Sequence, residues 1–595
     1  MVVVVTSLGG SLGCQEPTEA IVEISTDAVC SDVTGTGINA GLLGSIEKPV
    51  FDTSTSICEP NGDIGTIVLV PDEDDTAPFA FKVVTSVGGD VDKCSAELLD
   101  PTCIVARRAM RFVPKTPFHV PVPMRQACAG VECPSTQTCV DGICRSATVN
   151  PADCIDPAIG CDLTPGEVPA WQKQFGGTGT QLGRSMAITD NGLVALTGSF
   201  DGDLTVGGNV HKSSGYQDVF LATFTQGGMF RWSASYGSAS PDEGTSVAFG
   251  AKSDVYLVAN FQESIDFGTG ELKSAGGTDV ALVKFVSTGK PRWAIRFGGP
   301  LGDTATKVAV GPNDITLVAG SFSGSMTIQG KEPKTLTSNG ETDAFVASFS
   351  ASGDLLWATS FGGATGDSAS GVGVDAEGRV YVAGRFTGEM SLGGKAPFVA
   401  NDGDAFVASF DAQGGLRWAK AFGGIGSDNA LDVAARDQRI VVTGQVTSNT
   451  SIDGVPLQAG ATDGFVAAWN PEGKLEWARA FGNPNGETDL GISVSIAKDG
   501  SIVLGGESFN PVLNAPAPTL KGARNPFVAV LEAGGSTRWA RSFGSSEYAS
   551  MAAVAASPHG SAFLTGWFVE ELEAADGNLT SAGQEDVFLY HVTPP

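Results

Sequence analysis

The sequence predicts an all-β protein whose larger part is a seven-bladed β-propeller. Tryptophan recurs at intervals of 59 to 64 residues through the last 425 of 595 residues, and a period of that length indicates stacked supersecondary units. Each tryptophan is followed four residues later by Phe or Tyr and then by Gly, and at strand periodicity the two rings share one face. The seven are Trp171, Trp232, Trp293, Trp357, Trp418, Trp477 and Trp539.

The composition agrees with β structure and restricts the partners. Counts of 79 Gly and 32 Phe with 17% charged residues favour short strands and tight turns over helices. A net charge of −30 argues against binding a nucleic-acid backbone or anionic lipid, because both need clustered Lys and Arg. We therefore expect no nucleic-acid partner, and contact with a membrane only through a lipid anchor.

One repeat can be divided into four strands. In the best-preserved copy, Ser370 to Asp375 alternates small and apolar residues, and Gly378 to Phe386 reads as a second strand. After a variable stretch, Asp404 to Phe410 is the third strand and Leu416 to Phe422, with Trp418, is the fourth. Each repeat is thus one four-stranded blade.

The third and fourth strands form a hairpin with constant spacing. An Asp or Asn stands 14 residues before the next tryptophan and a Gly stands four before it, and Gly supplies the positive φ that a hairpin turn needs. The two series are Asp218, Asp279, Asp343, Asp404, Asp463 and Asn525, and Gly228, Gly289, Gly353, Gly414, Gly473 and Gly535.

The two ends of the array are complementary. No third-strand pattern precedes Trp171, and no tryptophan strand follows the final third strand, Asp586 to Val592. Pairing these two strands would complete the seventh blade and remove the sheet edges that an open array would expose. We therefore predict a ring closed by its N-terminal strand.

The region before the array is predicted to hold a small β-sandwich-like domain, because runs such as Ala20 to Ile24, Thr66 to Val70 and Phe79 to Val84 alternate with turn residues. The expected divisions are a signal or lipobox-like segment at 1–14, the sandwich at 15–126, a cysteine-rich module at 127–161, a linker at 162–169 and the propeller at 170–595.

All eleven cysteines lie between Cys14 and Cys161. Six fall within 34 residues, with no CxxC pair and no His among them, which favours disulfides formed in an oxidising compartment over zinc. The pairing of the first four stays open, since three arrangements are equally allowed. The predicted disulfide cysteines are Cys30, Cys58, Cys94, Cys103, Cys128, Cys133, Cys139, Cys144, Cys154 and Cys161.

Cys14 is left over, and it follows a short apolar run that resembles a bacterial lipoprotein signal. Ser11 and the lack of a basic residue depart from that pattern, so a merely apolar segment or a late translation start is the alternative. We expect export to the bacterial cell envelope or surface, with lipidation at Cys14 as its anchor.

The repeated sequence Asp-Ala-Phe-Val-Ala-Ser-Phe, a Gly-containing turn, Trp-Ala and Phe-Gly-Gly resembles the SBBP family of bacterial β-propeller repeats. Tyr236 in place of Phe and Asn525 in place of Asp are local departures. The resemblance implies an exported or cell-surface protein without shared catalytic residues.

The hairpin is also similar to the tryptophan-docking motif of quinoprotein propellers, at Ala408, Gly414 and Trp418. Phe410 stands where that motif has Asp. With seven units and no cysteine in the ring, the similarity implies a shared packing solution and not quinone chemistry.

The tryptophans and their aromatic partners are read as inter-blade packing, with a sugar-stacking platform as the alternative. A second acidic series stands six residues after each aromatic partner, in the loop that leads to the next blade. These carboxylates could ring the mouth of the central channel and hold Ca²⁺, and we expect no other cofactor. Alternatively, each carboxylate caps its own loop. The series is Asp242, Asp303, Asp367, Asp428 and Glu487.

Both variable loops of each blade should emerge on one face, because strand direction alternates, and such faces bind ligands. We expect a non-enzymatic scaffold that binds a protein or a glycan there, and we assign no catalytic residue, since the four histidines form no metal motif. The alternatives are a polysaccharide hydrolase or lyase using acidic residues of that face, and a purely structural surface protein.

Overall fold

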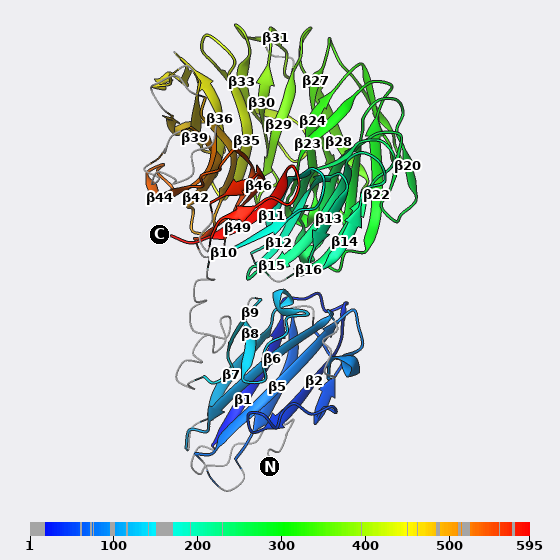
Figure 1. Cartoon of the computed structure of the whole chain (residues 1–595), viewed down its shortest axis with the longest axis vertical. Coiled ribbons are helices and arrows are strands. Elements are labelled where there is room, and N and C mark those ends of the chain that lie inside the picture. Colours follow the sequence, from blue (N-terminus) through cyan, green and yellow to red (C-terminus); the bar gives the residue numbers. More distant parts are fainter. Residues whose placement is uncertain are drawn as a thin grey trace. The chain divides into compact units, whose positions relative to one another are not determined.

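The computed structural model describes residues 18–59, 62–71, 74, 76–95, 101–114, 117–140, 142–149, 170–190, 192–228, 230–393, 396–448, 450–460, 462–482, 488–509, 513, 524–557, 560–573 and 577–594. Within these ranges the regular structure is β-strands with a few 3-10 turns. The chain forms two compact units, one built largely from residues 1–168 and the other from the repeats (Figure 1).

The first unit contains two larger sheets, with strand orders β4-β1-β7 and β3-β2-β5-β6, and a two-stranded sheet described below. In β1 every second residue is buried, the alternation expected of a strand with one face in a core. Its neighbour β7 runs parallel to it and contains Pro121 and Pro123, which is why β7 is at the edge of its sheet. The strands are β1 (Glu19–Thr26), β2 (Val33–Gly41), β3 (Thr53–Thr55), β4 (Asp63–Leu69), β5 (Pro78–Val87), β6 (Cys103–Arg111) and β7 (Pro117–Met124).

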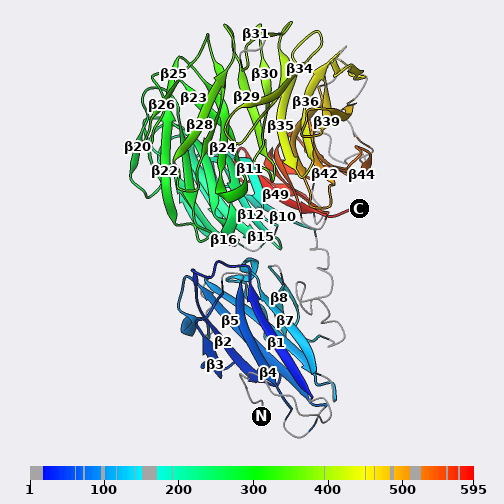
Figure 2. The same cartoon turned by 180° about the vertical axis from the view of Figure 1, so that it is seen from behind.

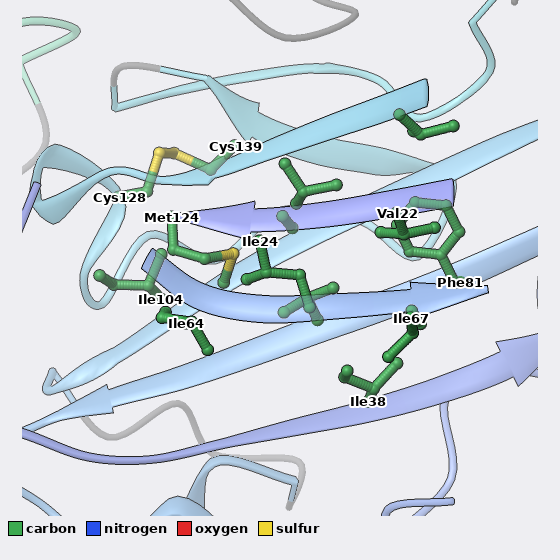
Figure 3. Packing of buried hydrophobic residues seen from close by; sticks show 14 of the residues in the cluster. Val22, Ile24, Ile38, Ile64, Ile67, Phe81, Ile104, Met124, Cys128 and Cys139 are labelled. Carbon is green, nitrogen blue, oxygen red and sulfur yellow. A yellow bond between two sulfur atoms is a disulfide. The ribbon is translucent and has the colours of Figure 1, made fainter. Parts of the chain in front are cut away.

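The cysteine-rich segment contributes to the same core. Its hairpin of β8 (Gln137–Val140) and β9 (Ile143–Ser146) contacts β6, and Cys128 and Cys139 are buried with Val22, Phe81 and their neighbours (Figure 3). The disulfides are Cys30–Cys58, Cys94–Cys103, Cys128–Cys139 and Cys133–Cys144, which selects one of the pairings that the sequence left open. Cys14, Cys154 and Cys161 lie outside the described residues.

The second unit is the seven-bladed propeller (Figure 2), and each blade contains four antiparallel strands from its inner to its outer edge. From inner to outer strand the first six blades are β11 (Gln181–Ile188), β12 (Leu193–Phe200), β15 (Asp218–Thr225), β16 (Phe230–Tyr236); β17 (Asp242–Phe249), β18 (Val255–Phe261), β21 (Asp279–Phe285), β22 (Pro291–Gly298); β23 (Asp303–Val310), β24 (Thr316–Phe322), β27 (Asp343–Phe349), β28 (Leu355–Phe361); β29 (Ser368–Val374), β30 (Val380–Phe386), β33 (Asp404–Phe410), β34 (Leu416–Phe422); β35 (Asn429–Arg436), β36 (Arg439–Thr447), β39 (Thr462–Trp469), β40 (Leu475–Phe481); and β41 (Leu490–Ile496), β42 (Ile502–Ser508), β43 (Asn525–Leu531), β44 (Thr537–Ser542).

The seventh blade joins both ends of the array, as predicted. It consists of β45 (Tyr548–Ala556), β46 (Ala562–Val569), β49 (Asp586–Val592) and β10 (Trp171–Phe175). Strands β10 and β49 are antiparallel, with Trp171 opposite His591, and the Trp171 ring lies 5.8 Å from that of Phe563. Each inner strand contacts the next, and β45 contacts β11. The ring is therefore closed (Figure 1).

Each tryptophan from Trp232 to Trp477 holds the hairpin turn of the following blade. The Trp357 indole N–H donates to Ala412 O at 2.9 Å, and a Cβ on Gly414 would lie 2.7 Å from the Trp357 ring. Gly414 also has φ +84°. Glycine is therefore favoured for two reasons, the close contact with the Trp357 ring and the left-handed backbone conformation. The same contact between an indole and a turn carbonyl of the next blade recurs at five of the seven tryptophans. The other indole–carbonyl pairs are Trp232–Ser287, Trp293–Ala351, Trp418–Pro471 and Trp477–Ala533.

Each glycine of the Phe-Gly-Gly signature is explained by a different close neighbour that leaves no room for a Cβ. A Cβ on the first, such as Gly362, would meet the carboxylate of the hairpin aspartate Asp343, and a Cβ on the second, Gly363, would meet Glu389 O. That carbonyl belongs to an insert hairpin between the second and third strands of the next blade. The inserts are β13 (Asp203–Val206) with β14 (Asn209–Lys212), β19 (Ser264–Asp266) with β20 (Glu271–Lys273), β25 (Ser325–Ile328) with β26 (Lys334–Thr337), β31 (Glu389–Met390) with β32 (Phe398–Val399), β37 (Ser451–Ile452) with β38 (Val455–Pro456), and β47 (Glu571–Leu572) with β48 (Leu579–Thr580).

Several insert hairpins also cover the outer strand of the preceding blade. β25 pairs with β22 and extends that blade to six strands. Isolated bridges join Gly362 to Ser391 and Ser545 to Leu572 in the same relation. Exposed edge strands can pair with other chains, so these hairpins occupy edges that the ring itself would leave open.

Candidate binding face

One face of the propeller carries both kinds of variable loop. The loops from an outer strand to the next inner strand contact the inserts: Thr205 N–H donates to Gly176 O at 3.3 Å, and the Asn401 amide donates to Gly424 O at 3.4 Å. We call this surface the loop face, defined by residues 176–180, 237–241, 298–302, 362–367 and 423–428 together with the inserts. The expectation that both loops emerge together is thereby met.

Apolar side chains are exposed on the loop face. Tyr216 is 68% exposed, Leu301 54% and Ile425 74%, and each lies in or beside a loop that defines the face. The inserts add Val210, Val399 and Val455. In contrast, the tryptophan rings of the repeat pack between blades, and Trp539 is buried at 7% exposure. The other six tryptophans are half-buried, and the sugar-stacking platform stays an alternative for them.

The aspartates of the second acidic series accept hydrogen bonds from the backbone of the loops that form this face. Asp367 accepts the Gly363 N–H at 2.7 Å and the Thr387 N–H at 3.1 Å, and so ties its loop to the end of β30. Asp242, Asp303 and Asp428 each accept two amides in the same way. For these four residues the geometry is that of the capping alternative.

Glu487 lies outside the described residues. The equivalent position is occupied by Asp489, whose N–H donates to Thr462 O at 3.1 Å as that of Asp428 does to Gly403 O at 2.8 Å. The sequence places Asp428 six residues after Phe422 but Asp489 eight after Phe481. Counting a fixed interval missed Asp489 because this loop is two residues longer.

The carboxylates do not gather into a multidentate site within the described ranges, where no three His, Cys, Asp or Glu side chains come together as metal ligands. Ca²⁺ takes six to eight oxygen ligands, whereas the four aspartates are turned toward the amides of their own loops. A cation at the channel mouth stays a prediction from the sequence.

Burial changes the acidity of these aspartates. Loss of hydration raises the pKa of Asp242 to about 7 and those of Asp303 and Asp367 to about 6. The carboxylate of the preceding hairpin aspartate acts in the same direction, as Asp218 does on Asp242. Backbone N–H donors oppose both effects without cancelling them.

The central channel is crossed by ion pairs between blades that are not adjacent. Lys307 on β23 lies 3.0 Å from buried Asp432 on β35. On the intervening strand β29, a Cβ on Gly371 would approach Asp432 Cα to 3.0 Å. Arg436 at the end of β35 lies 3.3 Å from Asp190 in the first blade. Charges of opposite sign thus link facing walls of the channel.

Near the closure seam, Arg184 lies 2.5 Å from Glu243 and 5.0 Å over the Trp567 ring. Its guanidinium is paired on one side and stacked on the other. It joins the first, second and seventh blades, which gives it a structural role. Among the described residues, no helix has the length and apolar character needed to cross a membrane.

No family model matches the chain. Among curated proteins, it is 25% identical over 352 residues to the regulatory protein FlaEY of Caulobacter vibrioides, covering 55% of this chain and 36% of that protein. It is 22% identical over 230 residues to an uncharacterized WD repeat-containing protein of Acanthamoeba polyphaga mimivirus, covering 32% and 17%. The chain thus spans about a third and about a sixth of the lengths of these relatives.

Among solved structures, the WD40 β-propeller domain of Doa1 matches 71% of this chain and 96% of its own at 11% identity and a TM-score of 0.36. A Synechocystis apocarotenoid oxygenase matches 87% and 91% at 9% identity and a TM-score of 0.29. The β-propeller-like repeat fold rests on the strand pairing of this chain itself. The likeness to SBBP repeats stays a resemblance drawn from the motif.

Proposed function

We propose that the protein is a non-enzymatic scaffold that binds a protein partner through the loop face of its propeller. The observation that carries the proposal is the division of each blade into repeated and variable parts. Trp–Gly docking and aspartate caps recur from blade to blade, while Tyr216, Leu301 and Ile425 differ from their counterparts and are exposed. A rigid ring that presents varied apolar side chains is suited to protein recognition.

We also propose that the protein is exported. Four disulfides join residues of the first unit, and disulfides persist in oxidising compartments. Anchoring through a lipid on Cys14 in the bacterial envelope belongs to the same proposal. Mass spectrometry of the mature N-terminus tests it, because an unmodified thiol at Cys14 would contradict lipidation.

Binding is tested with two matched triple variants of the full-length protein. Tyr216→Ser, Leu301→Ser and Ile425→Ser change the loop face, whereas Leu42→Ser, Val50→Ser and Ile57→Ser remove side chains that are 56%, 73% and 61% exposed in the first unit. Quantitative cross-linking to envelope proteins should yield a partner that the first variant loses at least about tenfold, which is about 1.4 kcal/mol. Loss in the second variant alone would contradict the proposal.

A glycan ligand is the second outcome to be separated from the first. A glycan array with the same three proteins would show sugar binding that the loop-face variant loses and the other variant keeps if the face recognises carbohydrate. The hydrolase or lyase alternative gains no specific support from the described residues, because the four aspartates of the acidic series serve loop amides.

A further inference from the structure

Exposed aliphatic side chains gather on one sector of the loop face, between the fourth and fifth blades. Val399 is 68% exposed, Ile425 74% and Val455 43%. Val399 belongs to insert strand β32, Ile425 to the loop between the two blades and Val455 to insert strand β38. We call these three residues the apolar patch. Exposed apolar side chains that lie together mark interaction sites, whereas single ones need no explanation.

The first two members of the apolar patch are connected through the backbone that precedes Ile425. Asn401 lies two residues after Val399, and its side-chain amide donates to Gly424 O at 3.4 Å. Gly424 directly precedes Ile425. The insert of the fourth blade and the loop to the fifth blade are therefore in contact next to these two side chains.

Val455 is connected to the same loop through the start of the fifth-blade insert. A Cβ on Gly424 would lie 2.9 Å from Thr450 Oγ1, so the loop packs against this insert. Thr450 O accepts the Leu457 N–H at 2.9 Å, and Leu457 lies two residues after Val455. The three exposed side chains thus belong to segments that contact one another, and the apolar patch is one surface.

Two exposed acidic side chains border the apolar patch, and neither has an ion-pair partner among the described residues. Glu389 is directly opposite Val399 in the β31–β32 hairpin, so the two side chains lie on the same face. Asp402 follows Asn401. The nearby Arg385 donates to the backbone carbonyl of Asp402 at 3.3 Å and not to its carboxylate.

A third acid beside the apolar patch is already neutralised within the chain. Asp453 lies 2.9 Å from Lys420 and accepts the Trp469 indole N–H at 3.3 Å. The net charge of the protein is −30, which acts in the same direction as the two unpaired acids. A partner with basic groups is therefore favoured, whereas a second copy of this chain would bring like charges together.

The other exposed apolar side chains of the loop face are arranged differently. Val210 and Tyr216 belong to the first blade, and Leu301 belongs to the loop before the third blade, so they are spread over a wider arc. The charges beside Val210 are already matched, because Lys212 lies 3.2 Å from Asp203. This sector provides a comparison surface of similar exposure on the same face.

We infer that the apolar patch is the anchor site of the protein partner, and that this partner presents an apolar side chain flanked by Lys or Arg. The inference rests on the proposed function and narrows it to one sector of the loop face. The apolar side chain of the partner removes the patch from water, while its basic groups pair with Glu389 and Asp402 at the rim. An apolar centre with a polar rim is the usual anatomy of a protein interface. The aliphatic patch has no aromatic ring on which a sugar could stack.

Peptide phage display on the full-length protein tests the inference, with random peptides as the probe. We expect the enriched peptides to carry a positive net charge and to combine Lys or Arg with a large apolar residue. Surface plasmon resonance with these peptides then gives association and dissociation rates for the wild type and for three variants. The wild type should bind more weakly as the salt concentration rises, because exposed charges are screened.

Two variants separate the apolar centre from the charged rim. The patch variant, Val399→Ser with Ile425→Ser and Val455→Ser, should weaken binding at least about tenfold, mainly through faster dissociation. The charge variant, Glu389→Gln with Asp402→Asn, should weaken it about threefold through slower association and should reduce the salt dependence. All five side chains are exposed, so the fold is retained.

The comparison variant, Val210→Ser with Tyr216→Ser and Leu301→Ser, should stay within about twofold of the wild type. Loss in this variant and not in the patch variant would overturn the inference and leave the loop face as the binding surface. Enrichment of neutral or acidic peptides would also overturn it. If no peptide depends on either sector, the proposed function fails as well. Dimerisation that the patch variant abolishes, measured by sedimentation, would assign the patch to a second copy instead.

Discussion

The two units of this chain secure a β structure in opposite ways. The sandwich unit has an irregular sequence, and its described part contains four disulfides. The propeller contains no cysteine and repeats one set of contacts around a ring, with its ends joined by β10 and β49. The comparison shows that disulfide bonds and cyclic strand pairing are two alternative ways to restrain the chain in a β structure.

The two units also differ in which parts of the structure their stabilising bonds connect. A disulfide such as Cys30–Cys58 closes a loop of 28 residues within one unit. In contrast, Trp357 and Ala412 are joined by one weak hydrogen bond that recurs, in five described copies, between successive blades. The first unit is stabilised by a few covalent bonds, whereas the propeller is stabilised by one weak contact that is repeated between blades.

Reduction is the largest perturbation that separates the two units. Each disulfide closing a loop of 9 to 28 residues contributes about 3 kcal/mol, so reduction should unfold the sandwich unit while the propeller persists. Hydrogen exchange with mass spectrometry, with and without reductant, measures both units in one sample. Simultaneous loss of protection in the repeats would contradict the separation.

Opening the ring is the corresponding test of the propeller. Deletion of residues 171–175 removes β10 and exposes the edge of β49, with an expected loss of about 5 kcal/mol from the ladder and from buried Phe175. Chemical denaturation monitored by tryptophan fluorescence measures it. The control deletes residues 162–166 in the expected linker, and an equal loss there would show that closure contributes little.

The docking glycine gives a smaller and sharper test. Gly414→Ala places a methyl group against the Trp357 ring and also strains a residue with φ +84°, so we expect a loss of about 3 kcal/mol. Gly454→Ala is the matched control, because its φ is +82° and nothing lies within 4 Å of its Cβ. Its loss should be about 1 kcal/mol. Equal losses would mean that the ring contact is unimportant.

The indole hydrogen bond is expected to have the smallest effect. Trp357→Phe removes the donor to Ala412 O and should cost about 1 kcal/mol more than Trp539→Phe. The indole N–H of Trp539 has no acceptor within the described structure, because the seventh blade has chain ends where the others have a hairpin turn. Denaturation of both variants measures the difference, and a zero difference would remove this bond from the account of docking.

Most of the propeller was predictable because its residues repeat. Strands β33 and β34 have the predicted bounds, Asp404–Phe410 and Leu416–Phe422, since their alternation and turn glycine are both explicit. β30 begins at Val380 and not at Gly378, because Gly378 occupies a turn with φ +78°. Closure followed from counting unpaired strands, which needs no side-chain detail.

The rest depended on geometry that a linear pattern does not contain. Disulfide pairing was open because spacing does not give distances. The role of the acidic series was open because equal spacing is produced both by caps and by a ring of ligands. The common position of Asp343 and Asp367 beside Gly362 could not be predicted, because the two aspartates are 24 residues apart in the sequence and approach the same glycine only in the folded structure.

The insert hairpins have a consequence for how many copies of this protein can coexist. By pairing with β22, strand β25 takes up hydrogen-bonding groups that would otherwise template the addition of a foreign chain. The end of β22 that β25 covers is therefore closed to edge-to-edge pairing with a second copy of this chain.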